Sequence, residues 1–275
     1  MNFSMSRTWN ETTSLLGRNF GLLAVLAGLF LFLPQGLLYV VFPEAMTQQM
    51  QVGIGASMSG EDGSVAFFVA SLLLSLIQIL GLTAMTALLD QHKRPTVGQA
   101  IEIAARRFLT VFACFLIAMV VVLALCVPVL LFVGFDAVMS GDMSGAIGRM
   151  MFGALVLLIV LLYLAGRMSV LMAVITLDGV GNPFRALADS WRLTSPAQWR
   201  IFGFYLLLLV VALVIMLVVG MVFGAIGAAT GSQSVAILLN SVFGAFANVV
   251  TVAIGVAIYY QLAGPGTRQL SDAFE

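Results

Sequence analysis

Six long apolar segments constrain the fold of this chain more than any motif does. A helix needs roughly 20 mostly apolar residues to cross the roughly 30 Å hydrocarbon core of a membrane. Six segments meet this requirement, at about residues 19–42, 65–89, 108–135, 151–177, 201–228 and 235–263. The composition agrees, because 61% of the 275 residues are hydrophobic and only 9% are charged. We therefore expect an all-α polytopic membrane protein with six transmembrane helices in a single transmembrane domain, residues 1–275.

The distribution of lysine and arginine predicts how these helices are oriented. One side of the expected membrane carries the basic residues Arg7, Arg18, Lys93, Arg94, Arg106, Arg107, Arg185, Arg192, Arg200 and Arg268. The other side carries Arg149 together with the acidic residues Glu44, Glu61, Asp62, Asp136 and Asp142. Because cytoplasmic loops carry an excess of Lys and Arg, we expect both termini in the cytoplasm and the chain in the cell (inner) membrane.

Two segments on the basic side have the pattern of amphipathic helices. Between Pro95 and Phe108, apolar residues recur at helical spacing, and Pro95 is suited to a first helical turn. The stretch from Asn182 to Trp199 starts with Asn182 as a candidate N-cap, followed by Pro183. A helix of this kind lies in the membrane interface with its apolar face toward the lipid. We expect both segments to do so.

Aromatic and basic side chains of these segments are interpreted as interface anchors, since tryptophan prefers the level of the lipid headgroups. The anchors are Trp9, Trp191, Trp199, Arg185, Arg192 and Arg200. The partners we expect are membrane lipids, anionic lipids among them, and either another membrane protein or a second copy of this chain. We expect no nucleic acid partner and no cofactor.

Matching residues suggest an internal repeat. Asp90 and Pro95 recur as Asp178 and Pro183, and Arg18 and Phe20 recur as Arg106 and Phe108, all at an offset of 88 residues. The repeating unit is one amphipathic helix followed by two spans, used three times, and the order of apolar segments supports it independently. A threefold arrangement of helix-plus-hairpin units with parallel topology would follow.

The residues needed for several kinds of catalysis are few. Lys93 is the only lysine and His92 the only histidine, which disfavours a phosphate-binding loop, a histidine-based zinc site and a Ser/His dyad. No Asp or Glu falls inside an expected span, so the carboxylates of coupled transporters and of intramembrane aspartic proteases are missing there. We therefore expect no enzymatic activity, no catalytic residues and no metal ligands.

One charged side chain, Arg167, lies inside the expected fourth span. It is about ten residues, or about 15 Å, from the cytoplasmic end of that span near Asp178. A guanidinium in a membrane costs at least a few kcal/mol unless it finds water or partners, so such a residue is a candidate functional site. The alternative is that the span ends near Gly166 and that Arg167 snorkels or pairs with helix-end carbonyls.

Amide side chains inside the spans are the remaining polar candidates. Gln78, Asn240, Asn248 and Gln261 could bind a ligand or form hydrogen bonds between helices, and the second role is the commoner one. Small residues would permit close approach of the last two spans; they are Gly220, Gly224, Gly227, Gly244, Ala245 and Ala247.

A resemblance to a known family is carried by residues of the second half of the chain. They are the run from Arg167 through Met-Ser-Val-Leu-Met-Ala-Val-Ile-Thr-Leu to Asp178, then Pro183, Ala186, Ser190-Trp191-Arg192-Leu193-Thr194, Trp199-Arg200-Ile-Phe-Gly203 and Tyr259-Tyr260. The pattern resembles the six-span bacterial membrane proteins of the glycerophosphoryl diester phosphodiesterase membrane-domain and YciC-type family. The resemblance implies a membrane location and a fold. It does not imply phosphodiesterase activity, and the function of that family is largely unknown.

The residues and the resemblance together lead to three hypotheses. The first is a non-enzymatic membrane protein that organises lipid or a partner protein at the cytoplasmic face through its amphipathic helices and a membrane-facing Arg167. The second is a permease or facilitator for a lipid-like or apolar solute, which a polar cavity reaching Arg167 and Gln78 would favour. The third is a lipid head-group enzyme in which Arg167 holds phosphate and Asp178 acts as a base.

Overall fold

The computed structural model describes residues 3–42, 63–133, 147–230 and 233–272, and helix is the regular structure that these residues form. Three stretches run from the start of the chain to its middle: α1 (Met5–Ala27) with the π-helical turn η1 (Gly28–Phe32) and α2 (Leu33–Val41), then α4 (Gly63–Leu88), then α5 (Val97–Val133). The second half contains α7 (Ile147–Met168), α8 (Leu171–Leu177), α9 (Pro183–Thr194), the short 3₁₀ turn η3 (Ser195–Ala197), α10 (Gln198–Thr230) and α11 (Gln233–Asp272).

Six helical stretches are long and apolar enough to cross a membrane, which confirms the predicted fold class. They are Met5–Tyr39, Val65–Leu88, Val97–Phe132, Gly148–Leu177, Pro183–Gly227 and Leu238–Ala263. The acidic residues expected on the side opposite the basic residues, Glu44, Glu61, Asp62, Asp136 and Asp142, lie outside the described residues.

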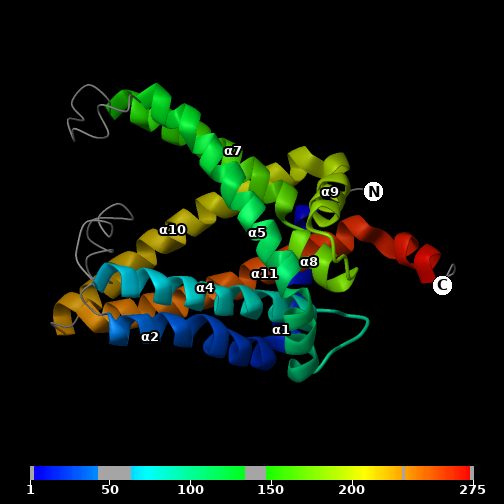
Figure 1. The fold of residues 1–275 in the computed structure, drawn as a ribbon, viewed down its shortest axis with the longest axis horizontal. Helices are drawn as coiled ribbons and strands as arrows, with labels where there is room; N and C mark the ends of the chain where they lie inside the picture. Colours follow the sequence, from blue (N-terminus) through cyan, green and yellow to red (C-terminus); the bar gives the residue numbers. More distant parts are fainter. Residues whose placement is uncertain (1–2, 43–62, 134–146, 231–232, 273–275) are drawn as a thin grey trace.

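The helices converge at one end of the molecule and spread apart toward the other (Figure 1). Both chain ends and the turn between α4 and α5 lie at the convergent end. The helix pair α5 and α7 diverges from the group that contains α2, α4 and α11 (Figure 1). The turn after α4, which carries Lys93 and Arg94, and α9, which carries Arg185, are both at the convergent end, so we call it the basic end.

The buried core is concentrated at the basic end. Its fully buried members come from all six spans and include Leu26, Met85, Ala104, Val174, Ile201 and Ile258. By contrast, the most apolar 18-residue stretches of the third and fifth spans contain no buried residue. Their leucine, valine and isoleucine side chains are exposed, as in a protein whose solvent there is hydrocarbon rather than water.

The two amphipathic segments differ from one another in the structure. The second forms a separate helix as predicted, because Asn182 caps α9 by accepting hydrogen bonds from the backbone N–H groups of Phe184 and Arg185. The first is not a separate interfacial helix, and that prediction was wrong. It is the beginning of α5, which at about 1.5 Å per residue is about 55 Å long. On its apolar face, Ala100 and Ala104 are fully buried against other helices, while Val97, Ile101 and Phe108 are half-buried.

Two glycines permit close helix contacts, but not those the sequence suggested. A Cβ added at Gly81 of α4 would overlap the Cβ of Phe30, which the η1 turn pushes toward α4. A Cβ added at Gly255 of α11 would lie 2.7 Å from the carbonyl oxygen of Ser169, at the break between α7 and α8. The last two spans, α10 and α11, do contact one another, as predicted. Gly220, Gly224 and Gly244 are not at a close contact, because an added Cβ meets nothing within 4 Å at these three positions.

Candidate functional site

Arg167 is the centre of a hydrogen-bonded cluster that joins three helices. Its Nε and Nη2 donate to the hydroxyl of Tyr163 at 3.1 and 2.9 Å. Its Nη1 donates to the carbonyl oxygen of Trp191 at 3.2 Å and to Oγ of Ser195 at 3.1 Å, and Nη2 donates to Oε1 of Gln198. We call these five residues the Arg167 cluster. It ties α7 to the end of α9 and to the start of α10.

The Arg167 cluster leaves no room for a ligand. The side chain of Arg167 is 5% exposed, and its guanidinium lies 4.5 Å from the ring centroid of Trp191 and 5.3 Å from that of Tyr163. The depression beside it is too small to hold a water molecule. Arg167 therefore does not face the membrane, which corrects the expectation of a lipid-facing guanidinium. Because Trp191 is in the last turn of α9, the contact with a helix-end carbonyl is the alternative that the structure shows.

The other polar candidates lie apart from one another. Asp178 follows α8, is exposed, accepts a hydrogen bond from the hydroxyl of Tyr259, and lines a different pocket from Arg167. Gln261 binds the N-terminal segment, because its Oε1 accepts from Ser4 N at 3.2 Å and its Nε2 donates to Thr8 Oγ1 at 3.0 Å.

The three remaining amides do not join helices in the part of the chain that the structure describes. Asn248 is exposed and donates to the carbonyl oxygen of Gly244 in its own helix at 2.9 Å. Asn240 is exposed and Gln78 is half-buried, and neither side chain forms a hydrogen bond with a described residue. None of the three lines the pockets described below.

The predicted anchors are mostly exposed at the basic end. Trp9 and Trp199 are exposed, and Arg200 donates to the carbonyl oxygen of Phe3 at 3.4 Å. Arg185 and Arg192 both pair with Asp189 on the outer face of α9, at 3.7 and 3.5 Å. Trp191 is the exception, because it also covers the guanidinium of Arg167.

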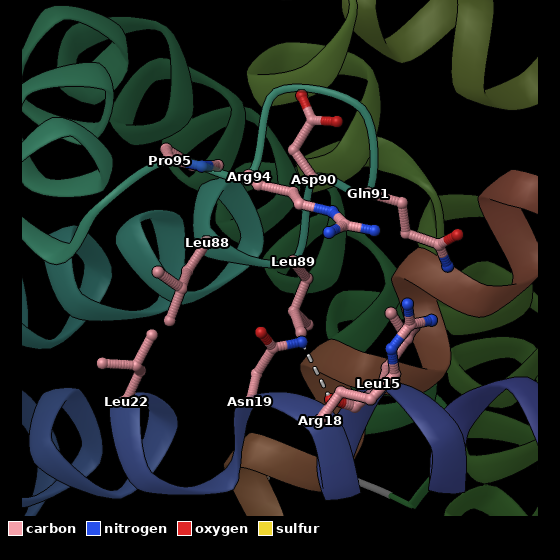
Figure 2. Close-up of a pocket in the computed structure, with 10 residues that line it drawn as sticks. All are labelled: Leu15, Arg18, Asn19, Leu22, Leu88, Leu89, Asp90, Gln91, Arg94 and Pro95. Carbon is pink, nitrogen blue, oxygen red and sulfur yellow. Dashed lines mark hydrogen bonds between the residues drawn. The ribbon is translucent and has the colours of Figure 1, made fainter.

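A pocket of about 290 Å³ opens at the basic end between α1 and the turn that follows α4. This volume is near the lower limit of ordinary small-molecule sites, roughly 300 Å³. The pocket has two chemically different sides. Figure 2 shows the guanidinium groups of Arg18 and Arg94 and the amide of Gln91 on one side, and Leu22 and Leu88 on the other. We call it the Arg18–Arg94 pocket.

The two guanidinium groups of this pocket are not neutralised within the described chain. Neither Arg18 nor Arg94 forms a side-chain hydrogen bond or ion pair with a described residue, and both are exposed. The carboxylate of Asp90 also borders the pocket, but its Oδ1 accepts from the backbone N–H groups of His92 and Lys93 and points away from Arg18 (Figure 2). The pocket therefore offers two cationic donors beside an apolar wall.

The backbone of the turn holds Arg94 in an unusual conformation. Asp90 accepts a hydrogen bond from Arg94 N through its carbonyl oxygen at 3.1 Å, and Arg94 has a φ of 42°. It is the one non-glycine residue with positive φ in the described chain. The left-handed region costs a side-chain-bearing residue about 1 to 2 kcal/mol. Such strain, once observed, is a reason to suspect a functional role.

Sequence reasoning did not identify Arg18 and Arg94 as site residues. They were counted only as charges on the basic side, because a residue's charge is visible in the sequence while its lack of a partner is not. The internal repeat could have indicated these sites, because its offset of 88 residues matches Arg18 with Arg106 and Asp90 with Asp178.

The fold defines the class of protein: six long apolar helices that bury a core at one end and expose apolar side chains elsewhere fit a multi-pass integral membrane protein. Comparisons with protein-family models, with curated proteins and with solved structures found no match. The family resemblance described above therefore stays a prediction. Among the described residues, no three His, Cys, Asp or Glu side chains gather closely enough to hold a metal ion.

Proposed function

We propose that this protein binds the phosphate of an anionic phospholipid in the Arg18–Arg94 pocket and so organises lipid at the cytoplasmic face of the membrane. The observation that carries the proposal is the pair of arginines without anionic partners in the described chain, placed beside the leucine wall. Arginine is suited to this role because its planar guanidinium donates two parallel hydrogen bonds to a phosphate.

The two sides of the pocket correspond to the two parts of a phospholipid. Leu22 is one turn of α1 beyond Arg18, toward the apolar part of the span, and its side chain is 45% exposed. A phosphate held by Arg18 and Arg94 would place the glycerol and the start of the acyl chains along Leu22 and Leu88. Basic pockets between helices on the cytoplasmic side are known lipid headgroup sites.

The other two hypotheses gain less from the structure. A permease would be favoured by a polar cavity joining Arg167 to Gln78, whereas Arg167 is enclosed by protein groups. A head-group enzyme would need Arg167 and Asp178 at one site, whereas they line different pockets. Lipid organisation without chemistry therefore remains the proposal, and it now rests on Arg18 and Arg94 rather than on Arg167.

Native mass spectrometry of the protein released from nanodiscs of mixed phosphatidylcholine and phosphatidylglycerol tests this function. The wild type should retain phosphatidylglycerol, and Arg18→Gln/Arg94→Gln should bind it roughly 30-fold more weakly, at about 1 kcal/mol for each basic residue. Arg7→Gln is the control, since Arg7 is an exposed arginine of the same helix outside the pocket. Equal retention by the double variant and the wild type would overturn the proposal.

A further inference from the structure

A second pocket at the basic end resembles the first in the positions that line it. It has a volume of about 210 Å³ and lies between α5, the end of α8 and the turn after α4. Its cationic residues are Lys93, Arg106 and Arg107, and its acidic residues are Asp90 and Asp178. We call it the Arg106–Arg107 pocket.

The two pockets are related by the internal repeat. Seven residues of the first pocket each have a counterpart in the second pocket exactly 88 positions later in the sequence. In the first pocket they are residues 15, 18, 19, 88, 89, 90 and 91, and in the second they are residues 103, 106, 107, 176, 177, 178 and 179. Seven of the ten residues around each pocket thus correspond. Arg18 corresponds to Arg106, and Asp90 corresponds to Asp178. The repeat expected from a few identities in the sequence therefore relates two pockets in space.

The two carboxylates of the Arg106–Arg107 pocket are already engaged by protein donors. Asp178 accepts a hydrogen bond from Tyr259, and Asp90 accepts from the backbone N–H groups of His92 and Lys93. Of the cations, Arg106 pairs with Glu102 at 2.6 Å in an exposed contact, which is worth little because water screens it. Lys93 is exposed and forms no side-chain ion pair with a described residue.

Arg107 lies against the backbone of the turn after α8. A Cβ added at Gly179, whose φ is 72°, would be 3.0 Å from Nη2 of Arg107, and one added at Gly181 would be 3.3 Å from Nη1. The two glycines therefore allow the guanidinium to lie close to the turn, with its edge at the pocket. This places a third cationic donor beside Lys93 and Arg106.

The second pocket differs from the first on its apolar side. The position of Leu22 is occupied by Thr110, which is buried and donates to the carbonyl oxygen of Gly181 at 2.9 Å. Leu22, in contrast, is exposed along the side of the first pocket. The second pocket thus has Arg106 at the position of Arg18 and two further cations, Lys93 and Arg107, whereas the position of Arg94 is occupied by Asn182, which does not line it. It also lacks the exposed leucine along which an acyl chain would lie.

We propose that the Arg106–Arg107 pocket is a second phosphate-binding site, equivalent to the first by the repeat and taking the phosphate group of a water-soluble molecule. The inference rests on the proposed function for the chemistry of the first pocket. The shared ligand chemistry is a phosphate group, which either a lipid headgroup or a free phosphate could supply, so the test separates these two sources.

The test uses two double variants that each remove two positive charges, Lys93→Gln/Arg106→Gln in the second pocket and Arg18→Gln/Arg94→Gln in the first. In nanodiscs of phosphatidylcholine alone, the unfolding midpoint is measured against sodium phosphate, with sodium chloride at equal ionic strength as the reference. Phosphate should raise the midpoint of the wild type and of Arg18→Gln/Arg94→Gln. In Lys93→Gln/Arg106→Gln the phosphate concentration for half of the effect should rise roughly tenfold or more.

A second experiment with anionic lipid tests whether a lipid headgroup supplies the phosphate. If phosphate has no effect on the wild type, and Lys93→Gln/Arg106→Gln retains less phosphatidylglycerol by native mass spectrometry, the pocket does not take a water-soluble ligand and the proposal is overturned in favour of a lipid site. If Lys93→Gln/Arg106→Gln matches the wild type in both arms, there is no second site. Because the phosphate arm contains no anionic lipid, it succeeds or fails independently of the lipid function proposed for the first pocket.

The variant Arg107→Gln tests the Arg106–Arg107 pocket through a side chain that the double variant leaves intact. It should weaken the phosphate effect as the first variant does, provided that its midpoint without phosphate stays within the range of the other variants. An unaltered phosphate response in Arg107→Gln and in Lys93→Gln/Arg106→Gln would contradict the assignment.

Discussion

Arg18 and Arg106, 88 positions apart, each line a pocket together with the turn that follows the next span. In both pockets an aspartate begins the turn, Asp90 in one and Asp178 in the other. Two consecutive tyrosines of α11 reach these turns, because Tyr260 accepts a hydrogen bond from Gln91 N at 3.0 Å and Tyr259 donates to Asp178. The last span thus holds the walls of both pockets in place.

The π-helical turn of the first span should make Gly81 sensitive to a single methyl group. Gly81→Ala should lower the free energy of unfolding by about 1 to 3 kcal/mol, because its Cβ would overlap Phe30 and force α1 and α4 apart. Gly21→Ala is the control, since an added Cβ there meets nothing within 4 Å, and it should raise stability by up to about 1 kcal/mol. Thermal or denaturant unfolding in detergent checks both. Equal effects of the two changes would refute the close contact.

The Arg167 cluster should not tolerate lysine. Arg167→Lys should lower the free energy of unfolding by about 2 to 3 kcal/mol, because an ammonium cannot reach Tyr163, Ser195 and Gln198 as the planar guanidinium does. The exposed Arg192→Lys should change it by less than about 0.5 kcal/mol. Phosphatidylglycerol retention should be unaltered in folded Arg167→Lys. If Arg167→Lys were stable but retained less phosphatidylglycerol, Arg167 would be a lipid ligand after all.

The N-terminal segment should depend on Gln261. Gln261→Leu removes the hydrogen bonds to Ser4 and Thr8, each worth about 1 kcal/mol, so residues 3–12 should exchange amide hydrogens faster. Asn248→Leu is the matched control, since that amide is exposed and bonds only to its own helix. Hydrogen exchange followed by mass spectrometry measures both. Unaltered exchange at residues 3–12 in Gln261→Leu would show that this contact does not hold the segment.

The strained backbone of Arg94 should lower the stability of the protein while its side chain contributes to lipid binding. Arg94→Gly should raise the free energy of unfolding by about 0.5 to 1 kcal/mol, since relief of the left-handed conformation exceeds the added flexibility of glycine. The neighbouring Lys93→Gly, which removes a residue outside the positive-φ region, should lower it by about 0.4 to 1 kcal/mol. Only Arg94→Gly should also weaken phosphatidylglycerol retention. The opposite order of stabilities would mean that Arg94 is not strained.

Hydrophobic length predicted the six spans because a membrane imposes that length on every helix. It could not predict that residues 97–108 continue into α5, because an amphipathic pattern looks the same whether its apolar face meets lipid or, as at Ala100 and Ala104, other helices. Arg167 was found because a charge inside an apolar run is conspicuous. Apart from Tyr163 in the same helix, its hydrogen-bond acceptors come from positions 24 to 31 residues later, such as Trp191 and Gln198, and only the fold brings them together.

The internal repeat was the sequence feature that came closest to predicting the residues of the two pockets. The pairs Arg18 with Arg106 and Asp90 with Asp178 were visible as identities at one offset, and they proved to line corresponding pockets. What the sequence did not show is that Thr110 replaces Leu22, since an alignment of positions does not tell which side chain faces a pocket.

Photo-crosslinking with a phosphatidylglycerol that carries a diazirine near the start of its acyl chain tests the central claim most directly. In the wild type, the label should concentrate on peptides that contain Leu22 and Leu88, and Arg18→Gln/Arg94→Gln should remove this excess while a phosphatidylcholine probe labels both proteins alike. Labelling spread evenly over exposed apolar residues such as Leu131, Val214 and Leu217, and unaltered by the double variant, would contradict a phospholipid site at the Arg18–Arg94 pocket.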